Sequence, residues 1–505
     1  MPCLLGVDVS TTGVKALVIN ERGSVLSAIT TPHELSTPRP LWSEQHPEDW
    51  WSGTCNSIRE ALREAGISPE EILAVGLTGQ MHGLTLLDKR DGVLRPAILW
   101  NDQRTASQCD RIRRELGLER LTEITGNSAL TGFTLPKLLW VEENEPHVYS
   151  KVEHVLLPKD YVRLRLTGDH ATDCAGASGT SMFDIRRRDW SDDVLSAFSI
   201  PRCWLPKAHE GPEFTGEISA DAARATGLKA GMPVVAGAGD QAAQAVGVGA
   251  VSPGIAALTL GTSGVVFAST EEPIVEPQGR LHAHCHAVPN RWHMMGVMLS
   301  AGGSLRWLRD TFFPNVSFDD LTGDADGVRI GCDGLLFLPY LTGERTPHPD
   351  PLARGAFVGL TIRHGRGQIV RAVLEGVSFG LRDAFELLSA EGLPSIREVR
   401  VSGGGTGSGV WRQILADVVG ATLYGVDATE GAALGAALLA GIGARLWDTA
   451  DEACAQVVRK TDQTTPASAA EESYDELYEL YKAMYPTLKG AWHSLSRWEE
   501  EHYRP

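Results

Sequence analysis

The chain has 505 residues, of which 43% are hydrophobic and 22% are charged, and its formal net charge is −18. This composition is that of a globular protein of about two to four domains, long enough to bury a sizeable core. The excess of acidic groups argues against nucleic acid or an anionic membrane surface as a partner, because both bind to basic surfaces.

Cysteine usage and the first residues bear on location. The eight cysteines are scattered and form no CxxC pair, which argues against a zinc ribbon or a thioredoxin motif and is typical of a reducing compartment. The opening MPCLLGVDVS has no basic n-region, so we expect no signal peptide, and no apolar run in the sequence is long enough to cross a bilayer. These features predict a cytoplasmic protein.

The first 78 residues have the pattern of an α/β domain. Residues 3–30 contain three β-rich runs separated by tight turns. Pro47 and the helical spacing of the apolar residues after it predict a helix over residues 47–65. The apolar run 72–78 predicts a buried strand.

An internal echo suggests two such domains. Val9–Gly13 (VSTTG) lies between two strand-like runs, and Leu260–Gly264 (LGTSG) does so about half a chain later. Duplication of one α/β domain would produce this pattern, and a chance repeat of a common turn composition is the alternative. With the boundary in the segment GVGAVSPG, the predicted domains are residues 1–248 and 249–505, with a ligand cleft between them.

One carboxylate and two turns are candidates for binding a metal ion and phosphate. Asp8 ends the first strand, where an acid can hold Mg²⁺, and the hydroxyl and N–H groups of the next turn can cradle phosphate oxygens. The second turn has no acid, but its N–H groups and the Thr262 hydroxyl can grip the far side of a triphosphate. The alternatives are that Asp8 only caps its turn and that the second turn is an ordinary hairpin. The turn residues concerned are Thr11, Thr12 and Gly13 in the first half and Gly261, Thr262 and Ser263 in the second.

The segment 233–249 (PVVAGAGDQAAQAVGVG) predicts a strand, a glycine turn and a helix that begins at Asp240. The helix dipole keeps such a carboxylate ionised against the cost of burial, so Asp240 can accept the proton of an attacking hydroxyl; a plain helix cap is the alternative. Gly237–Ala242 also fits a loose dinucleotide-binding fingerprint, which would indicate an NAD-dependent dehydrogenase. We discount it because the acid expected about 20 residues later is missing.

Residues 399–420 predict a strand, a glycine run and a helix from about residue 409. Five glycines fall within 403–409, and backbone without side chains can lie flat against an adenine and a ribose; a flexible turn is the alternative. The chain contains no GxxxxGK[ST] motif, which excludes a P-loop enzyme. The run EGAALGAALLAG (430–441) predicts a closely packed helix.

Two polar segments that follow strands are candidates for binding a polyol. Gly79–Gly83 (GQMHG) and Trp100–Arg104 (WNDQR) supply hydrogen-bonding groups beside an apolar wall, as a sugar requires. Taken alone, His82 is more typical of a structural histidine.

Three histidines, His282, His284 and His286, alternate along HAHCHAV. On a strand they would share one face, with Cys285 on the other. A zinc site is one hypothesis, but we favour a half-exposed strand, because no second cluster of ligands accompanies the histidines.

Taken together, these segments resemble the FGGY carbohydrate kinases, and within them the xylulokinases, over nearly the whole chain. FTLPKLLW (133–140) and GAFVGLTIRHGRGQIVRAVLEGVSFG (355–380) match two signatures of the family, and GQMHG, RPAILWND, LLPKDY and LTGERTPH look xylulokinase-like. The resemblance implies an actin/hexokinase-like (ribonuclease H-like) fold of two duplicated α/β domains, with ATP and Mg²⁺ bound in the cleft between them. It also suggests a homodimer.

The resemblance implies a role for each candidate residue. Asp240 takes the position of the catalytic base, and Asp8 and Asp240 lie on the side of the metal ion. The sugar would meet Met81, His82, Trp100, Asp240 and Gln241. The phosphates would meet the two turns described above, and adenosine would meet Gly404, Gly405 and the start of the following helix as far as Gln413.

One departure from the family pattern concerns the sugar. Many xylulokinases have Asn after the catalytic acid, whereas this chain has Gln241, as glycerol kinases do. Glycerol kinases, however, carry Arg-Glu where this chain has Met81 and His82. The opening Val9-Ser10 also departs from the usual Leu-Gly.

We therefore predict an ATP-dependent carbohydrate kinase that converts a ketopentose, D-xylulose, into its 5-phosphate by in-line transfer. The alternatives are another FGGY activity, on ribulose, gluconate, glycerol or a sugar alcohol, and a non-catalytic regulator that binds a nucleotide or a sugar. The presence of both Asp8 and Asp240 argues against a regulator, which needs no base.

Overall fold

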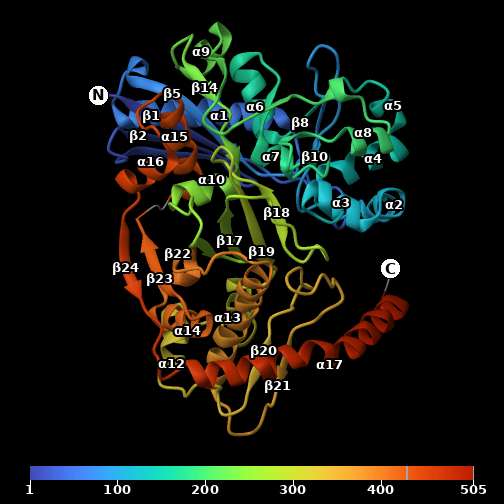
Figure 1. Cartoon of the computed structure of the whole chain (residues 1–505), viewed down its shortest axis with the longest axis vertical. Helices are drawn as coiled ribbons and strands as arrows, with labels where there is room; N and C mark the ends of the chain where they lie inside the picture. Colours follow the sequence, from blue (N-terminus) through green and yellow to red (C-terminus); the bar gives the residue numbers. More distant parts are fainter. Residues whose placement is uncertain (428–429, 504–505) are drawn as a thin grey trace.

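The computed structural model describes residues 1–427 and 430–503 and contains two large β-sheets, one above the other in Figure 1. The upper sheet is built from the first half of the chain and the lower sheet from the second. The strands of the first sheet, in spatial order, are β13 (Phe214–Glu217), β14 (Pro233–Val235), β5 (Ile72–Gly79), β1 (Cys3–Val9), β2 (Gly13–Asn20) and β3 (Val25–Pro32), and β15 (Ala238–Gly239) also pairs with β5. Those of the second are β18 (His282–Cys285), β19 (Trp292–Met298), β17 (Gly264–Thr270), β16 (Ile255–Leu260), β22 (Glu398–Ser402), β23 (Thr422–Val426) and β24 (Lys460–Thr464).

The two sheets repeat one pairing pattern. In the first, β1 pairs antiparallel with β2 and parallel with β5, and in the second β16 pairs antiparallel with β17 and parallel with β22. Further out, β3 corresponds to β19, β14 to β23, and the antiparallel edge strand β13 to β24. The second sheet adds only β18 at its other edge. This repetition confirms the duplicated α/β architecture that the two related turns predicted.

Helices cover the faces of both sheets. The predicted helix is present as α1 (Pro47–Ala65), with the His46 side chain as its N-cap and Gly66 in the left-handed region at its C-terminus. The other helices of the first half are α2 (Ala106–Leu116), α3 (Leu118–Thr125), α4 (Thr134–Asn144), α5 (Pro146–Tyr149), α6 (Pro158–Thr167), α7 (Cys174–Ser178), α8 (Asp192–Ala197), α9 (Ala220–Thr226) and α10 (Asp240–Gly247). Those of the second half are α11 (Gly302–Phe312), α12 (Phe318–Asp326), α13 (Arg366–Ala390), α14 (Gly409–Val419), α15 (Gly431–Gly443), α16 (Ala450–Val457) and α17 (Glu471–Tyr503).

Short strand pairs complete the fold. They are β4 (Glu44–Gln45) with β7 (Ala97–Ile98), β6 (Thr85–Leu87) with β8 (His154–Leu156), β9 (Ala171–Asp173) with β12 (Lys207–His209), β10 (Phe183–Asp184) with β11 (Asp189–Trp190), and β20 (Leu336–Leu338) with β21 (Ala356–Val358).

Helices α10 and α15 form the layer that joins the two halves (Figure 1). Although α15 comes from the second half, it packs on β1 and β5 of the first sheet. A Cβ atom at Gly76 of β5 would lie 1.9 Å from the Ala436 carbonyl oxygen, and one at Gly435 would lie 1.8 Å from that of Ala243 in α10. Only glycine allows backbones to approach so closely, which confirms the close-packed helix expected from the Gly/Ala run.

The polar segment 458–472 contains β24, which pairs with β23 as an edge strand. The proposed boundary at residues 248 and 249 lies between α10 and β16, and the division stays a prediction, because α15 packs across it. Among the described residues, no helix combines the length and apolar character needed to cross a membrane.

Candidate active site

The carboxyl ends of β1, β5 and β15 meet at one edge of the first sheet. The three strands are parallel, and Asp8 of β1 and Ala238 of β15 both pair with Thr78 of β5. Chain segments that leave parallel strands at one edge come close together, and ligands of α/β proteins bind there. This register brings together Asp8, Asp240 and the segment that carries Met81 and His82.

The two predicted acidic residues interact. Burial raises the pKa of Asp8 to about 6, against the opposing effect of Lys15, and its Oδ1 atom is buried without a hydrogen-bond partner among the described residues. Burial also raises the pKa of Asp240 to about 7, and the negative charge of Asp8 adds to this shift. The backbone N–H of Gln241 donates to Oδ1 of Asp240 at 2.8 Å, which holds the carboxylate at the N-terminus of α10. Asp240 is thus oriented and poised to exchange a proton near neutral pH.

The first turn, after Asp8, has a definite hydrogen-bond pattern. The Ser10 N–H donates to the Gly13 carbonyl oxygen at 3.0 Å, which closes the hairpin between β1 and β2. The Thr11 hydroxyl accepts a hydrogen bond from Nε1 of Trp100 at 2.9 Å, while Thr12 is exposed. A Cβ atom at Gly13 would lie 2.7 Å from the Thr31 carbonyl oxygen, so packing against β3 alone requires this glycine.

Met81 and His82 lie directly after β5, and His82 has a positive φ of 68°. Nδ1 of His82 lies 2.6 Å from the Gly179 carbonyl oxygen, and its ring stacks on Phe133 at a centroid distance of 4.3 Å. Burial lowers the pKa of His82 well below its usual value, so the imidazole is neutral. Met81 is buried and packs against Gly239, the residue before Asp240.

Trp100 is 43% exposed and offers an indole face beside the first turn, to which it is bound through Thr11. Gln241 is half-buried next to Asp240 on α10. Trp100 thus lies beside the turn after Asp8, and Gln241 lies beside Asp240 on α10.

A second set of predicted residues lines a cavity of about 320 Å³ at the carboxyl ends of β16 and β22. Thr259 pairs with Ser402 in the parallel register, so the two glycine turns leave the sheet side by side. The turn after β16 contributes Gly261 and Thr262 to the cavity wall, and the turn after β22 contributes Gly404 and Gly405, at the start of a short 3₁₀ turn before α14.

In the 261–264 turn, one of the backbone N–H groups expected to bind phosphate is already used within the turn. The Gly261 N–H donates to the Ser263 carbonyl oxygen at 3.0 Å, which leaves that group committed to the turn. The Thr262 side chain is exposed, and the Thr262 carbonyl oxygen accepts from Gly303 at the start of α11. The hydroxyl of Thr262 is therefore the better placed donor to a phosphate.

Gln413 does not line this cavity. It lies one turn into α14, and its Nε2 atom donates to Asp417 at 2.8 Å and to the Thr465 carbonyl oxygen at 3.0 Å. These contacts fix the start of α14 against the chain after β24, so in this structure Gln413 supports the helix that Gly405 precedes.

Sequence reasoning missed several residues of the two sites. In the cavity they are Leu305 and Arg306 of α11 and Phe318, Asp319 and Thr322 of α12, none of which belongs to a glycine motif. At the first site, the signature FTLPKLLW supplies two groups that hold His82: the Thr134 hydroxyl and the Lys137 ammonium donate to its carbonyl oxygen at 2.9 and 3.0 Å. The signature was recognised, and its polar residues Thr134 and Lys137 within an otherwise apolar helix could have suggested this supporting role.

The alternating histidines lie on β18 and just after it, but the favoured half-exposed strand is wrong. His282, His284 and His286 are between 1 and 3% exposed, as is His293 on β19. Their rings follow one another at centroid distances of 5.5 to 6.0 Å. Burial lowers the pKa of His284 to about 4 and that of His286 to about 3, so the row is neutral. Their nitrogen atoms do not converge into a three-ligand metal group among the described residues.

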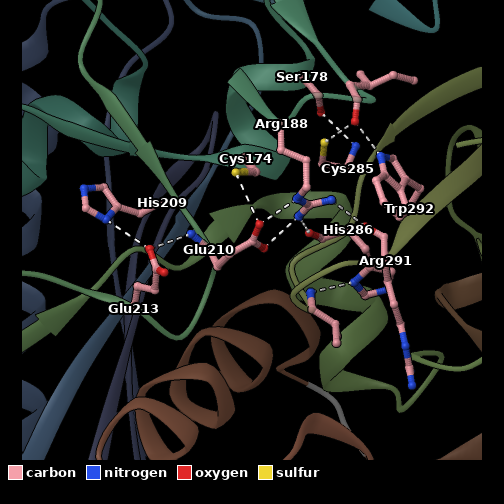
Figure 2. Close-up of polar contacts among 12 residues, drawn as sticks. Cys174, Ser178, Arg188, His209, Glu210, Glu213, Cys285, His286, Arg291 and Trp292 are labelled. Atoms are coloured by element: carbon pink, nitrogen blue, oxygen red, sulfur yellow. Dashed lines mark hydrogen bonds and ion pairs between the residues drawn. The ribbon is translucent and has the colours of Figure 1, made fainter. Parts of the chain in front are cut away.

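The strand is buried because the first half of the chain covers it. Figure 2 shows the contact: Arg188 forms an ion pair with Glu210 at 2.6 Å and donates to the Arg291 carbonyl oxygen at 2.9 Å. Nearby, the Cys285 N–H donates to the Ser178 hydroxyl of α7 at 3.2 Å. The edge of the second sheet thus docks on the first half of the chain.

Comparison with known proteins gives the family. The N-terminal domain of the FGGY family of carbohydrate kinases matches residues 3–247, and the C-terminal domain of that family matches residues 256–444. Xylulose kinase of Escherichia coli (strain K12) is 44% identical over 486 residues, which cover 96% of this chain and 99% of that protein.

The chain belongs to the FGGY family of carbohydrate kinases.

Solved structures agree with this assignment. The crystal structure of xylulose kinase from Rhodospirillum rubrum has a TM-score of 0.92 at 32% identity and covers 97% of this chain and 100% of that chain. That of gluconate kinase from Lactobacillus acidophilus has a TM-score of 0.93 at 25% identity, over 98% of this chain and 99% of that chain. The fold and the sugar kinase activity predicted from the sequence are confirmed, and the roles of individual residues remain predictions.

Proposed function

We propose that the protein transfers the γ-phosphoryl group of ATP to the 5-hydroxyl of D-xylulose, with Asp240 as the base. The observation that carries the proposal is the position of Asp240. It is the first residue of α10 and lies near Asp8 of β1, and α10 connects this site with the cavity at the ends of β16 and β22. Gln244, one turn further along α10, donates to Thr259 at 3.0 Å and to Ser402 at 3.2 Å. Because an α-helix rises about 6 Å over four residues, Asp240 stands about that far along the helix axis from Gln244.

In this proposal, different side chains accept the proton, orient the sugar and bind the nucleotide. Asp240 accepts the proton of the attacking hydroxyl, and a pKa of about 7 suits this role. Met81, His82, Trp100 and Gln241 orient the sugar, while the cavity between Gly261 and Gly405 holds adenosine and Thr262 faces the phosphates. Movement of the halves around α10 and α15 would exclude water, which would otherwise take the phosphoryl group.

The residues present fit a Mg²⁺ ion. Mg²⁺ prefers oxygen ligands, and the buried Oδ1 atom of Asp8 has no partner among the described residues that would compete for it. Asp8, with Asp240 beside it, would hold the ion, which when bound supplies positive charge to the phosphate oxygens.

The test is ADP release with Mg-ATP and a panel of D-xylulose, D-ribulose, L-ribulose, glycerol and gluconate. We expect preference for D-xylulose and a loss of about 10²- to 10⁴-fold in kcat for Asp240→Asn, as is usual for removal of a general base. Asp383→Asn is the matched control, because Asp383 is a buried carboxylate whose pKa is also raised to about 7, but it lies on α13 and accepts from Tyr478.

Each outcome is informative. Preference for another polyol, such as gluconate, would support the kinase activity but change the assigned substrate. Gln241 would then be the first residue to substitute. Near-normal turnover of Asp240→Asn would remove Asp240 from the role of base.

Location and assembly complete the proposal. We place the protein in the cytoplasm, where its nucleotide and sugar substrates are available, and we propose a homodimer on the family resemblance alone. Light scattering at several protein concentrations tests the second point, and a monomer at all of them would reject it.

A further inference from the structure

Three residues on the surface of the first half bring metal-binding atoms together. They are Asp91, in the turn after β6, His154, the first residue of β8, and His170, the residue before β9. One ligand atom from each lies within 4.8 Å of the other two. Nε2 of His170 is 2.8 Å from Oδ1 of Asp91, and Nε2 of His154 is 3.9 Å from the same oxygen. Nothing in the proposed phosphoryl transfer uses these residues.

The backbone that carries the three residues is held by hydrogen bonds. Leu87 of β6 pairs with His154 of β8, and the turn that bears Asp91 is closed by Asp88, whose Oδ1 accepts from the Gly92 N–H at 2.9 Å. His170 leads directly into β9, where Ala171 pairs with Lys207 of β12. The three side chains are therefore presented from fixed positions, as a metal site requires.

We propose that Asp91, His154 and His170 form a binding site for a divalent transition-metal ion such as Zn²⁺. Two imidazoles and one carboxylate are a donor set that suits Zn²⁺, Co²⁺ or Ni²⁺, whereas Mg²⁺ prefers oxygen atoms alone. Ligand atoms in a tetrahedral zinc site stand roughly 3.3 Å apart, which follows from metal–ligand distances near 2.0 Å. The distances of 2.8 and 3.9 Å lie on either side of this value, so small side-chain rotations are sufficient.

Exposure favours the site. The side chains are 43% exposed for Asp91 and 29% for each histidine, so an ion can enter and water can fill its open positions. The two imidazole rings stack at a centroid distance of 4.0 Å, which places the histidines side by side.

The ion would join three segments that are far apart in the sequence. β9 continues into α7, and the turn after α7 carries the Gly179 carbonyl oxygen that holds His82. The expected effect is stabilisation of this part of the first half when the ion is present, by the preference of the ion for the folded state.

The experiment uses tag-free, chelator-treated protein of full length, with Cys203→Ser in every variant because Cys203 is exposed. Titration with ZnCl₂ in a buffer that contains Mg²⁺ should show one Zn²⁺ per chain and a higher melting temperature. His154→Gln with His170→Gln should weaken binding by about 100-fold or more, since even outer partners of a metal ligand contribute roughly 10- to 100-fold. His147→Gln, on α5, changes an exposed histidine outside the site and should have no effect.

Two results would overturn the site. One is a double variant that binds Zn²⁺ within two-fold of the parent, since the ion would then be held elsewhere. The other is a strong thiolate charge-transfer band in the Co²⁺ complex, which would indicate cysteine ligands. The melting temperature of the metal-free double variant should equal that of the parent, which separates loss of the site from loss of the fold.

Discussion

The buried histidine row should make the contact between the halves sensitive to acid, and His286→Asn is the change that tests it. The His286 side chain is 1% exposed, and its Nδ1 atom accepts a hydrogen bond from the Val288 N–H at 3.0 Å. The amide oxygen of Asn can accept this bond in place of Nδ1, but Asn does not titrate. The substitution therefore removes the proton-binding group and retains the local turn.

The magnitude follows from the pKa values. Burial, with Arg291 and Arg188 nearby, lowers the pKa of His286 from 6.5 to about 3 in the folded protein. Between these values the unfolded chain binds a proton that the folded chain does not, so this contribution to stability is complete above pH 6.5 and is lost as the pH falls. At 1.36 kcal/mol per pH unit, His286 lowers the free energy of unfolding by about 2 kcal/mol at pH 5. His284, with a pKa of about 4, contributes in the same direction.

The assay is urea unfolding of wild type and His286→Asn at pH 7.5, 6.0 and 5.0. At pH 7.5 the variant should be the less stable protein, because the smaller side chain leaves a cavity. At pH 5.0 the difference should shrink by about 2 kcal/mol. His147→Asn, at an exposed position, should run parallel to wild type. Parallel curves for wild type and His286→Asn would refute a buried neutral imidazole at position 286.

Three other predictions concern the two sites and the layer between them. Met81→Ala and His82→Asn should raise the KM for the sugar by about ten-fold, equivalent to about 1.4 kcal/mol, and that for Mg-ATP much less; equal effects would contradict the sugar assignment. Gly404→Val should raise the KM for Mg-ATP and leave the melting temperature unchanged, because a Cβ at Gly404 meets nothing within 4 Å. Gly403→Ala is the contrasting variant and should lower the melting temperature. Its φ is +94°, and its Cβ would lie 2.6 Å from the Leu260 carbonyl oxygen. Gly76→Ala should lower the free energy of unfolding by about 3 kcal/mol or more, since its Cβ would collide with the backbone of α15, and thermal or urea unfolding measures this. A variant as stable as wild type would show that α15 can move away from β5.

The parts of the fold that could be predicted depend on local patterns. The helix at residues 47–65 follows from its proline and its apolar spacing, and it is present with those bounds as α1. The echo between VSTTG and LGTSG predicted the duplication because a hairpin between two strands is a short-range structure. Asp240 was placed at a helix N-terminus by the strand, turn and helix pattern around it, and α10 begins there.

The failures depend on contacts between distant segments. Alternation along HAHCHAV correctly indicated a strand, but exposure is decided by the segments that pack on it, and here Arg188 and Ser178 of α7 contact it from the first half of the chain. Gln413 was assigned to the nucleotide by motif position, and this assignment stays a prediction; its contacts with Asp417 and Thr465 become known only once β24 is placed. The cavity wall from α11 and α12 carries no motif, because such contacts can be made by many residue types.

The layer between the halves explains why one helix can serve both sites. The Cβ atoms absent from Gly247 and Gly435 allow α10 and α15 to touch through backbone, so α10 cannot shift relative to α15 without opening that contact. Asp240 and Gln244 lie four residues apart on one face of α10, and Gln244 is bound to both strands that end at the cavity. Gln244 therefore ties the helix that starts with Asp240 to the sheet that bears the cavity. We expect this tie to hold the proposed base and the proposed nucleotide site in a fixed relation, which is what in-line transfer requires of its two reactants.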